Sequence, residues 1–280
     1  MKNKWLEDKI ALVIGASGGI GKETAILLEE NGATLVISDI NQSGLEIVRN
    51  ELNNKPFIVP CDVTKLEEVK NLMKRVIEKY GRIDILINTV GIILPGAFED
   101  QSYEDIQKQI NINLLGTIHV EKEVIPFMKK AEKGHIVTIS SLAGIVPETY
   151  SSIYTATKFA LRGLNFCLYF ELQKYNIEVS TIFPDSVETP MLEYEAKHDG
   201  SPLTFLDEPV MPKEVAEAVL KAIKKKKVEV CVPHSTGVMS KLIMCMPRQV
   251  KRLWPKFEKK GEKKKKEYIK KLKERDAGKI

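Results

Sequence analysis

Cysteine is scarce in this sequence, and its spacing excludes two kinds of site. The four cysteines, Cys61, Cys167, Cys231 and Cys245, lie far apart and form no CxxC pair. A zinc site built on cysteine pairs and a secreted disulfide framework both need a closer spacing. We therefore expect no bound metal, and a protein of a reducing compartment, the cytoplasm.

Long apolar segments are also missing. Residues 1–9 hold five charged side chains and lack the apolar stretch of a signal peptide. No run of about 18 uncharged apolar residues occurs, so nothing in the sequence predicts a membrane span. A hydrophobic content of 43% still supports a full core and excludes a wholly disordered chain. We expect a soluble, folded protein.

Positive charge is concentrated at one end of the chain. The net charge is +5, but residues 251–280 hold 14 Lys or Arg against 5 Asp or Glu. That leaves 29 basic against 33 acidic residues in 1–250. A nucleic-acid-binding body is normally basic. We therefore expect no nucleic-acid partner for the mildly acidic body.

Short β-rich runs alternate with longer helical patterns along the body. The expected strands are Ile10–Ile14, Thr34–Asp39, Phe57–Val59, Ile83–Asn88, His135–Ser140, Glu178–Phe183 and Val228–Val232. The expected helices include Thr24–Glu30, Leu66–Tyr80, Ile153–Tyr175 and Pro212–Lys225. Strict alternation predicts an α/β fold with a doubly wound parallel sheet. We expect one domain over residues 1–233 and a basic, partly amphipathic extension over 234–280.

A glycine-rich loop follows the first strand. Gly15-Ala16-Ser17-Gly18-Gly19-Ile20-Gly21 lies between that strand and a helix, which is the context of a pyrophosphate-binding turn. The alternative is an ordinary turn without a ligand. In the predicted context, the loop indicates a dinucleotide site.

The end of the second strand bears on which dinucleotide binds. Asp39 lies 18 residues after Gly21, where a carboxylate accepts hydrogen bonds from ribose hydroxyls and repels a 2′-phosphate. Lys22 is the one nearby cation, and its helical position faces away. The pattern favours NAD over NADP. Asp62, after the third strand, could contact the adenine or cap the next helix.

Tyr154 and Lys158 form a YxxxK pattern. On a helix these positions are i and i+4 and share one face. A lysine cation stabilises a phenolate, and lowering the tyrosine pKa by three units takes about 4 kcal/mol. Alone, such a pair more often lies on a solvated helix face.

Further motifs accompany this pair: Ser140-Ser141 ends a strand 13 residues before Tyr154, Asn111-Ile112-Asn113 precedes Leu114-Leu115-Gly116, and Asn88-Thr89-Val90-Gly91 ends the fourth strand. With the glycine loop, the chain resembles a short-chain dehydrogenase/reductase of the Rossmann type over about residues 9–233.

The resemblance implies a role for each catalytic residue. Tyr154 is the general acid/base, and Ser141 hydrogen-bonds the substrate oxygen. Lys158 binds the nicotinamide ribose and lowers the tyrosine pKa, while Asn113 holds a water of a proton path. The implied cofactor contacts are Gly15, Ser17, Gly18, Gly19, Ile20, Gly21, Asp39, Ile40, Cys61, Asp62, Val63, Asn88, Thr89, Val90, Gly91, Tyr154, Lys158, Pro184, Asp185, Val187 and Thr189.

Three positions depart from the family pattern. Ile14 replaces a threonine, Val90 replaces an alanine, and Asp185 replaces a glycine near the nicotinamide. Each could alter cofactor affinity, but none is one of the four catalytic residues.

Residues 190–211 form a long segment at the C-terminal edge of the expected sheet, and such a segment indicates a lid over the substrate. We expect an apolar substrate site formed by Ser141, Leu142, Ile145, Tyr154, Met191 and Leu192, suited to a lipophilic alcohol or ketone. The alternative is that these apolar residues only pack the lid shut.

The extension mixes apolar residues and cations around Trp254, which suits a membrane interface. It could instead pack over the cleft or form a dimer contact. One branch of the family contains the 17-beta-hydroxysteroid and retinol dehydrogenases. The sequence resembles this branch in the order of Pro233, Leu242, Pro247 and Arg248.

The sequence thus predicts an NAD-dependent oxidoreductase acting on CH–OH groups, without metal, as a homodimer or homotetramer. Two alternatives stay open: an NADPH-dependent ketoacyl-type reductase, and a nucleotide-binding scaffold without catalysis.

Overall fold

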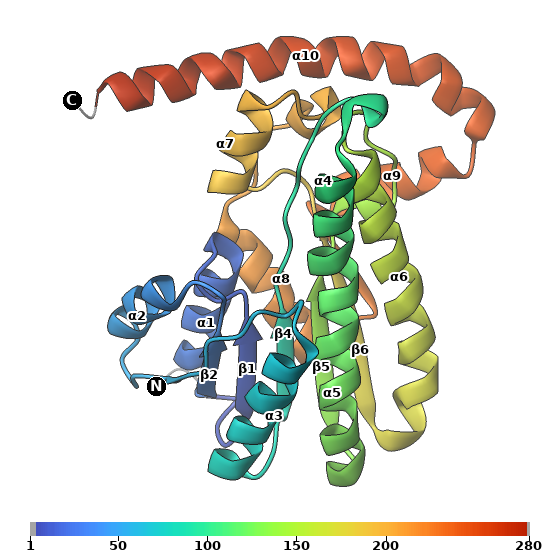
Figure 1. Ribbon diagram of the computed structural model, residues 1–280. Coiled ribbons are helices and arrows are strands. Elements are labelled where there is room, and N and C mark those ends of the chain that lie inside the picture. Colours follow the sequence, from blue (N-terminus) through green and yellow to red (C-terminus); the bar gives the residue numbers. More distant parts are fainter. Residues whose placement is uncertain (1–3, 279–280) are drawn as a thin grey trace.

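The computed structural model describes residues 4–278, in which one sheet lies between two layers of helices (Figure 1). Its strands are β1 (Ile10–Ile14), β2 (Thr34–Ser38), β3 (Phe57–Ile58), β4 (Ile85–Asn88), β5 (Gly134–Ile139), β6 (Ile177–Pro184) and β7 (Glu229–Val232). Its helices are α1 (Gly19–Glu30), α2 (Gln42–Glu51), α3 (Leu66–Tyr80), α4 (Tyr103–Gln109), α5 (Gly116–Ala131), α6 (Ser152–Leu172), α7 (Pro190–Lys197), α8 (Pro212–Lys225), α9 (His234–Met244) and α10 (Pro247–Ala277). Short helical turns are η1 (Phe98–Asp100), η2 (Ile110–Leu115), η3 (Leu142–Gly144), η4 (Gln173–Tyr175) and η5 (Pro202–Phe205).

The strands are all parallel and follow the order β3-β2-β1-β4-β5-β6-β7. The chain moves outward from β1 to β3, and then returns to the other side of β1 with β4. At such a reversal the loops after neighbouring strands diverge and leave a crevice at the carboxyl ends. The predicted doubly wound sheet is confirmed.

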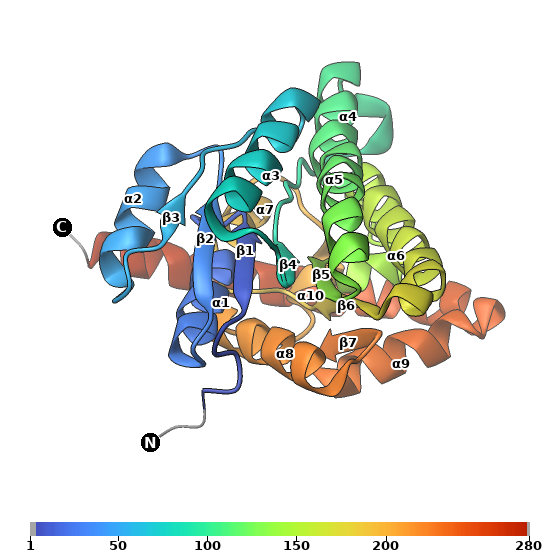
Figure 2. The ribbon, with the colours of Figure 1, turned by 90° about the horizontal axis from the view of Figure 1, so that it is seen from below.

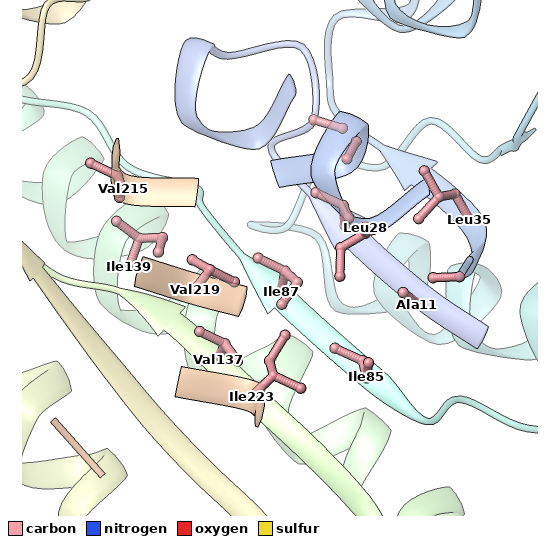
Figure 3. Close-up of a cluster of buried hydrophobic side chains, with 14 of the residues drawn as sticks. Ala11, Leu28, Leu35, Ile85, Ile87, Val137, Ile139, Val215, Val219 and Ile223 are labelled. Atoms are coloured by element: carbon pink, nitrogen blue, oxygen red, sulfur yellow. The ribbon is translucent and has the colours of Figure 1, made fainter. Parts of the chain in front are cut away.

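The sheet is buried on both faces, which explains why most of its strand residues are apolar. Successive side chains of β1 alternate between the two sides, so that Ala11 and Val13 face one cluster and Leu12 and Ile14 face the other. Helices α1 and α8 cover one face, and α3, α5 and α6 cover the other (Figure 2). Figure 3 shows Val219 and Ile223 of α8 packed over β4 and β5.

Two predicted helices, α3 and α8, have the bounds that the sequence indicated. Helix α1 begins at Gly19, five residues before the expected Thr24, because the glycine loop leads directly into it. The strands shift by at most two residues at either end.

The C-terminal extension forms α9 and α10. Helix α10 crosses the molecule above α7 (Figure 1) and packs on η5 and α7 within the predicted lid. Within residues 4–278, no helix is both long and apolar enough to cross a membrane.

Candidate active site

A cleft of about 510 Å³ opens at the carboxyl ends of the strands, where the sheet order reverses. Loops after β1, β2, β3, β4, β5 and β6 contribute to its lining, together with α6 and the lid. The sheet order places the end of β2, with Asp39, and the end of β5, with Ser141, on opposite sides of β1 and β4. The cleft is therefore an elongated site that the ends of six strands share.

The glycine loop is a tight turn that admits no side chains at two points. Gly15 has φ +80°, and a Cβ there would lie 2.4 Å from Thr89 Oγ1. A Cβ on Gly21 would lie 2.2 Å from the Gly15 carbonyl oxygen. Helix α1 begins at this turn with Gly18 as its N-cap and no side-chain cap. Its first N–H groups are thus free of a side-chain acceptor, which favours an anionic ligand.

Asp39 lies against the glycine loop. Its carboxylate accepts hydrogen bonds from the backbone N–H groups of Ser17, at 3.1 Å, and Asn41, at 2.9 Å. Lys22 turns away and pairs with Glu51 at 2.6 Å. The Asp39 carboxylate therefore makes this end of the cleft negative, because the nearby cation, Lys22, is paired with Glu51 instead.

Asp62 does not cap the next helix, because α3 has Lys65 as its N-cap and no side-chain cap hydrogen bond. The Asp62 Oδ1 instead accepts hydrogen bonds within the preceding loop, from the Thr64 N–H at 3.0 Å and the Thr64 hydroxyl at 2.7 Å. Asp62 lines the cleft, a position compatible with the expected contact to the adenine.

Asn88 is the one predicted cofactor contact that does not line the cleft. It is buried behind the wall, where its carboxamide donates to Thr117 Oγ1 at 3.0 Å and accepts from the Val90 N–H at 3.1 Å. Its contacts support the wall that Thr89, Val90 and Gly91 present to the cleft.

Tyr154 and Lys158 lie on one face of α6, as their spacing predicts. Lys158 Nζ lies 5.3 Å from the centroid of the Tyr154 ring. Lys158 is only 3% exposed, and its Nζ donates to the Ile139 carbonyl at 3.3 Å. Burial lowers the pKa of Lys158 to about 8.

The pKa of Tyr154 is raised above its ordinary value of 10, first by burial and then by the charge of Glu148. The Ser141 hydroxyl lowers this pKa by hydrogen bonding, and Glu195 raises it further. Lys158 does not contribute to this shift, so the expected lowering of the tyrosine pKa by Lys158 is not seen in the chain alone. A low tyrosine pKa needs a further positive charge in the cleft.

Asn113 lies in the π-helical turn η2 and joins three segments. Its carboxamide accepts from the Ile92 N–H at 2.8 Å and donates to the Ile92 carbonyl at 2.9 Å. It also donates to Thr157 Oγ1 on α6 at 3.3 Å. A Cβ on Gly91 would lie 3.2 Å from Lys158 Nζ and 3.6 Å from Asn113 Oδ1. Asn113 and Lys158 therefore both lie beside Gly91.

Ser141 lines the cleft, but two neighbours expected there do not. Leu142 and Ile145 are buried in a separate cluster with Phe183 and Cys231. The turn η3 reverses the chain directly after Ser141 and directs these side chains into the core. Their assignment to the substrate site is corrected accordingly.

The lid residues Met191 and Leu192 line the cleft as predicted, with three polar residues that the sequence analysis missed. Glu148 lies between η3 and α6, Glu195 on α7 and Thr204 in η5. The Thr204 hydroxyl donates to Glu195 Oε1 at 2.6 Å. Burial raises the pKa of Glu195 to about 7. Nothing in the sequence around either glutamate indicated that both would line the cleft.

Asp185 follows β6 and also lines the cleft. Its Oδ1 accepts a hydrogen bond from the Ser186 N–H at 2.9 Å. Burial, with a smaller contribution from Asp207, raises the pKa of Asp185 to about 6. The carboxylate that replaces the family's glycine therefore adds to the acidic character of the cleft.

Helix α10 holds the outside of the lid. Its Leu272 packs with Leu192, Ala196 and Phe205 in one buried cluster. Polar contacts surround that cluster: Lys264 Nζ to the Leu206 carbonyl at 2.8 Å, Lys265 Nζ to the Gly200 carbonyl at 2.8 Å, Tyr268 OH to Glu188 at 3.1 Å and Arg275 to Glu193 at 2.5 Å. Of the arrangements considered for the extension, packing over the lid is the one seen for α10.

The fold and the site agree with one family. The family model described as short chain dehydrogenase matches residues 9–200. The chain belongs to the short-chain dehydrogenase/reductase family, and it is an oxidoreductase with a nucleotide-binding Rossmann fold.

Similar proteins share the body of the chain. An uncharacterized oxidoreductase of Staphylococcus aureus (strain MRSA252) is 36% identical over 223 residues, which are 79% of this chain and 94% of the relative. One from Staphylococcus epidermidis is 34% identical over 188 residues, which are 67% of this chain and 82% of the relative.

Solved structures extend the comparison. A 3-ketoacyl-(acyl-carrier-protein) reductase from Brucella melitensis, complexed with NADH, has 26% identity and a TM-score of 0.75, covering 81% of this chain and 97% of its own. A Burkholderia phymatum short chain dehydrogenase/reductase in complex with NAD has 22% identity and a TM-score of 0.77, covering 86% and 94%. The second supports the fold alone.

Proposed function

We propose that this protein is an NAD-dependent dehydrogenase that transfers hydride between a nicotinamide and the carbon of an alcohol or ketone. The observation that carries the proposal is that Tyr154 and Ser141 line the same cleft as the glycine loop, with Lys158 buried beside the tyrosine. A phenol, a hydroxyl and a cation are the groups that proton transfer at a carbinol oxygen requires.

The residues of the cleft fit a dinucleotide. The open N-terminus of α1 suits a pyrophosphate, and the close contacts of Gly15 and Gly21 allow the backbone to approach it. Asp39 suits a ribose with a free 2′-hydroxyl, while the Lys22–Glu51 pair leaves that cation unavailable to a 2′-phosphate. These contacts favour NAD over NADP, as does the NADH named for the Brucella melitensis structure.

Each catalytic residue then has a defined task. When bound, the nicotinamide accepts hydride from the carbinol carbon, or returns it to the ketone. The Tyr154 oxygen takes the hydroxyl proton, and the Ser141 hydroxyl orients the substrate oxygen. Lys158, buried beside Tyr154, would supply positive charge near the phenol, and an oxidised nicotinamide would add to it against the burial that raises the tyrosine pKa. Asn113 would hold the water that connects Lys158 to solvent.

The substrate is proposed to have an apolar body. Ile92 and Ile93 after β4 and Met191 and Leu192 of the lid give the cleft apolar walls. These walls support a lipophilic alcohol or ketone as the substrate. From the sequence similarity to 17-beta-hydroxysteroid and retinol dehydrogenases, we further propose a substrate of similar shape.

Two surfaces support proposals about partners. Met239, Leu242 and Met246 are exposed on and just after α9, next to the exposed cations Lys251 and Arg252. We propose that this surface contacts an anionic lipid interface. We also propose a homodimer or homotetramer through α6, whose Phe166 and Phe170 are exposed. A monomeric mass in light scattering would contradict the second proposal.

The test of the function is turnover of a panel of secondary alcohols with NAD and with NADP. We expect reduction of NAD by at least one lipophilic carbinol. A clear preference for NADPH would favour the ketoacyl-type reductase, and NAD binding without any turnover would favour the scaffold.

A further inference from the structure

Two carboxylates from distant segments face the cleft near the catalytic tyrosine. Glu148 lies in the loop before α6, and Glu195 lies on the lid helix α7. Both glutamates lie close enough to Tyr154 that their charges raise its pKa. Glu195 also raises the pKa of Glu148, after burial, which is the larger cause. The two segments therefore place two acidic side chains where the substrate must lie.

Glu148 has no partner within residues 4–278: no hydrogen bond or ion pair reaches its carboxylate. Glu195 is better compensated, because the Thr204 hydroxyl donates to it and Lys265 acts on it electrostatically. Lys158 points to the Ile139 carbonyl instead. Glu148 is partly exposed to the cleft, and burial raises its pKa well above the ordinary value, which disfavours the charged form in the chain alone. A cation that arrives with the ligand would stabilise the charged carboxylate.

A second polar group in the cleft also lacks a partner. Ser186, after β6, lines the cleft and is only 7% exposed. Its hydroxyl has no hydrogen-bond partner in the part of the chain that the structure describes. Buried hydroxyls are rarely left without one, so this observation independently indicates a polar ligand in the cleft.

We propose that the substrate carries a protonated amine, and that Glu148 and Glu195 bind it while Tyr154 and Ser141 engage the reacting oxygen. This inference rests on the proposed function and narrows its substrate class to amino alcohols and amino ketones with an apolar body. Glu148 receives the ammonium, and Glu195, fixed by Thr204, lies on the lid that closes over it.

An ammonium suits this site better than a neutral donor. A substrate hydroxyl would donate a hydrogen bond but leave the carboxylate charge uncompensated, whereas an ammonium supplies both the hydrogen bond and the charge. Anionic substrates such as hydroxy acids would meet charges of their own sign at Glu148, Glu195 and Asp185.

The test uses matched carbinols and the full-length protein loaded with NAD. Each phenyl carbinol with a terminal primary amine, one to three methylenes from the carbinol carbon, is paired with the analogue that has a methyl group in place of the amine. Binding to the NAD complex is measured by calorimetry, and turnover by NADH formation. The variants are E148Q and E195Q. The matched control is E208Q, because Glu208 lies on the same lid segment but is exposed and pairs with Lys271 at 3.8 Å.

For at least one spacing, we expect the wild type to bind the amine more tightly than the methyl analogue. E148Q should reduce that preference about 30-fold or more, E195Q should also reduce it, and E208Q should leave it unchanged. Equal binding of amines and methyl analogues, or an amine preference that both E148Q and E195Q retain, would overturn the inference.

The inference and the proposed function fail differently. If methyl carbinols are oxidised as well as the amines, the proposed function stands and the amine proposal falls. If amines bind through Glu148 and Glu195 but no carbinol is ever oxidised, the binding site stands and the dehydrogenase proposal falls.

Discussion

Lys265 Nζ on α10 lies 2.8 Å from the carbonyl oxygen of Gly200, so that the last helix is bonded to the lid 65 residues earlier. The Gly200 N–H in turn donates to the Glu195 carbonyl at 3.0 Å. Lys265 is only 7% exposed, and its charge lowers the pKa of Glu195 against the larger effect of burial. The C-terminal helix is therefore connected by two hydrogen bonds to a residue that lines the cleft.

Replacing this lysine tests whether α10 positions the lid. Lys265→Met keeps most of the apolar stem but removes the N–H donors and leaves the Gly200 carbonyl without them. We expect a loss of about 1–3 kcal/mol in unfolding free energy, and a several-fold higher KM for the carbinol, with the KM for NAD unchanged. The control is Lys266→Met, because Lys266 is exposed and, within residues 4–278, forms an ion pair only with Glu262. Equal effects of the two variants would contradict a specific role for Lys265.

Asp39 tests the proposed cofactor preference. Asp39→Ala removes the carboxylate that lies against the Ser17 N–H, and with it the repulsion of a 2′-phosphate. We expect weaker NAD binding and stronger NADP binding, which together change the ratio of the two Kd values about tenfold or more, or about 1.4 kcal/mol. Fluorescence titration with both nucleotides measures this ratio. An unchanged ratio would remove Asp39 from the account of specificity.

The exposed surface of α9 predicts lipid binding. Replacing Met239 and Leu242 with serine should reduce flotation of the full-length chain with anionic vesicles, because both side chains are exposed and make up much of its apolar surface. Neutral vesicles should bind the unaltered chain less, since the neighbouring cations contribute about 1 kcal/mol each only at an anionic surface. Flotation that neither the substitutions nor the lipid charge alters would contradict this proposal.

His135 predicts how stability depends on pH. Burial lowers its pKa from 6.5 to about 4, and its Nε2 lies 2.8 Å from Ser180 Oγ. Because the folded pKa is below the unfolded one, the unfolded chain binds the proton first as the pH falls. The contribution of neutral His135 to the unfolding free energy is therefore fully present above pH 6.5. It decreases by about 3 kcal/mol as the pH falls toward 4.

The measurement is the difference in unfolding free energy between the wild type and His135→Gln across this pH range. The wild type should lose its advantage over the variant as the pH falls. His198→Gln, at an exposed position, serves as the control. A difference for His135→Gln that stays constant with pH would contradict the assigned shift.

The parts of the site that could be predicted are those encoded locally. Tyr154 and Lys158 are one helical turn apart, and Gly15 and Gly21 belong to one loop between a strand and a helix, so their spacing alone placed them. Leu142 and Ile145 lie in an irregular turn, where no periodicity indicates the direction of a side chain, and the expectation that they face the cleft was wrong.

Other features depend on how distant segments meet. Glu148 and Glu195 lie on a loop and on the lid, and each alone resembles an ordinary surface glutamate. The packing of Leu272 on Leu192 joins segments 80 residues apart, and the composition of α10 was equally compatible with a lipid surface or a second copy of the chain. Tertiary structure was needed to choose among these arrangements.

The central claim is that Tyr154 exchanges a proton with the substrate oxygen beside a bound NAD. The most direct measurement is a single turnover of a carbinol that the wild type oxidises, with Tyr154→Phe at saturating NAD. The account predicts that NAD affinity is retained while NADH formation falls by at least a hundredfold. NADH formation at the wild-type rate in this variant would contradict it.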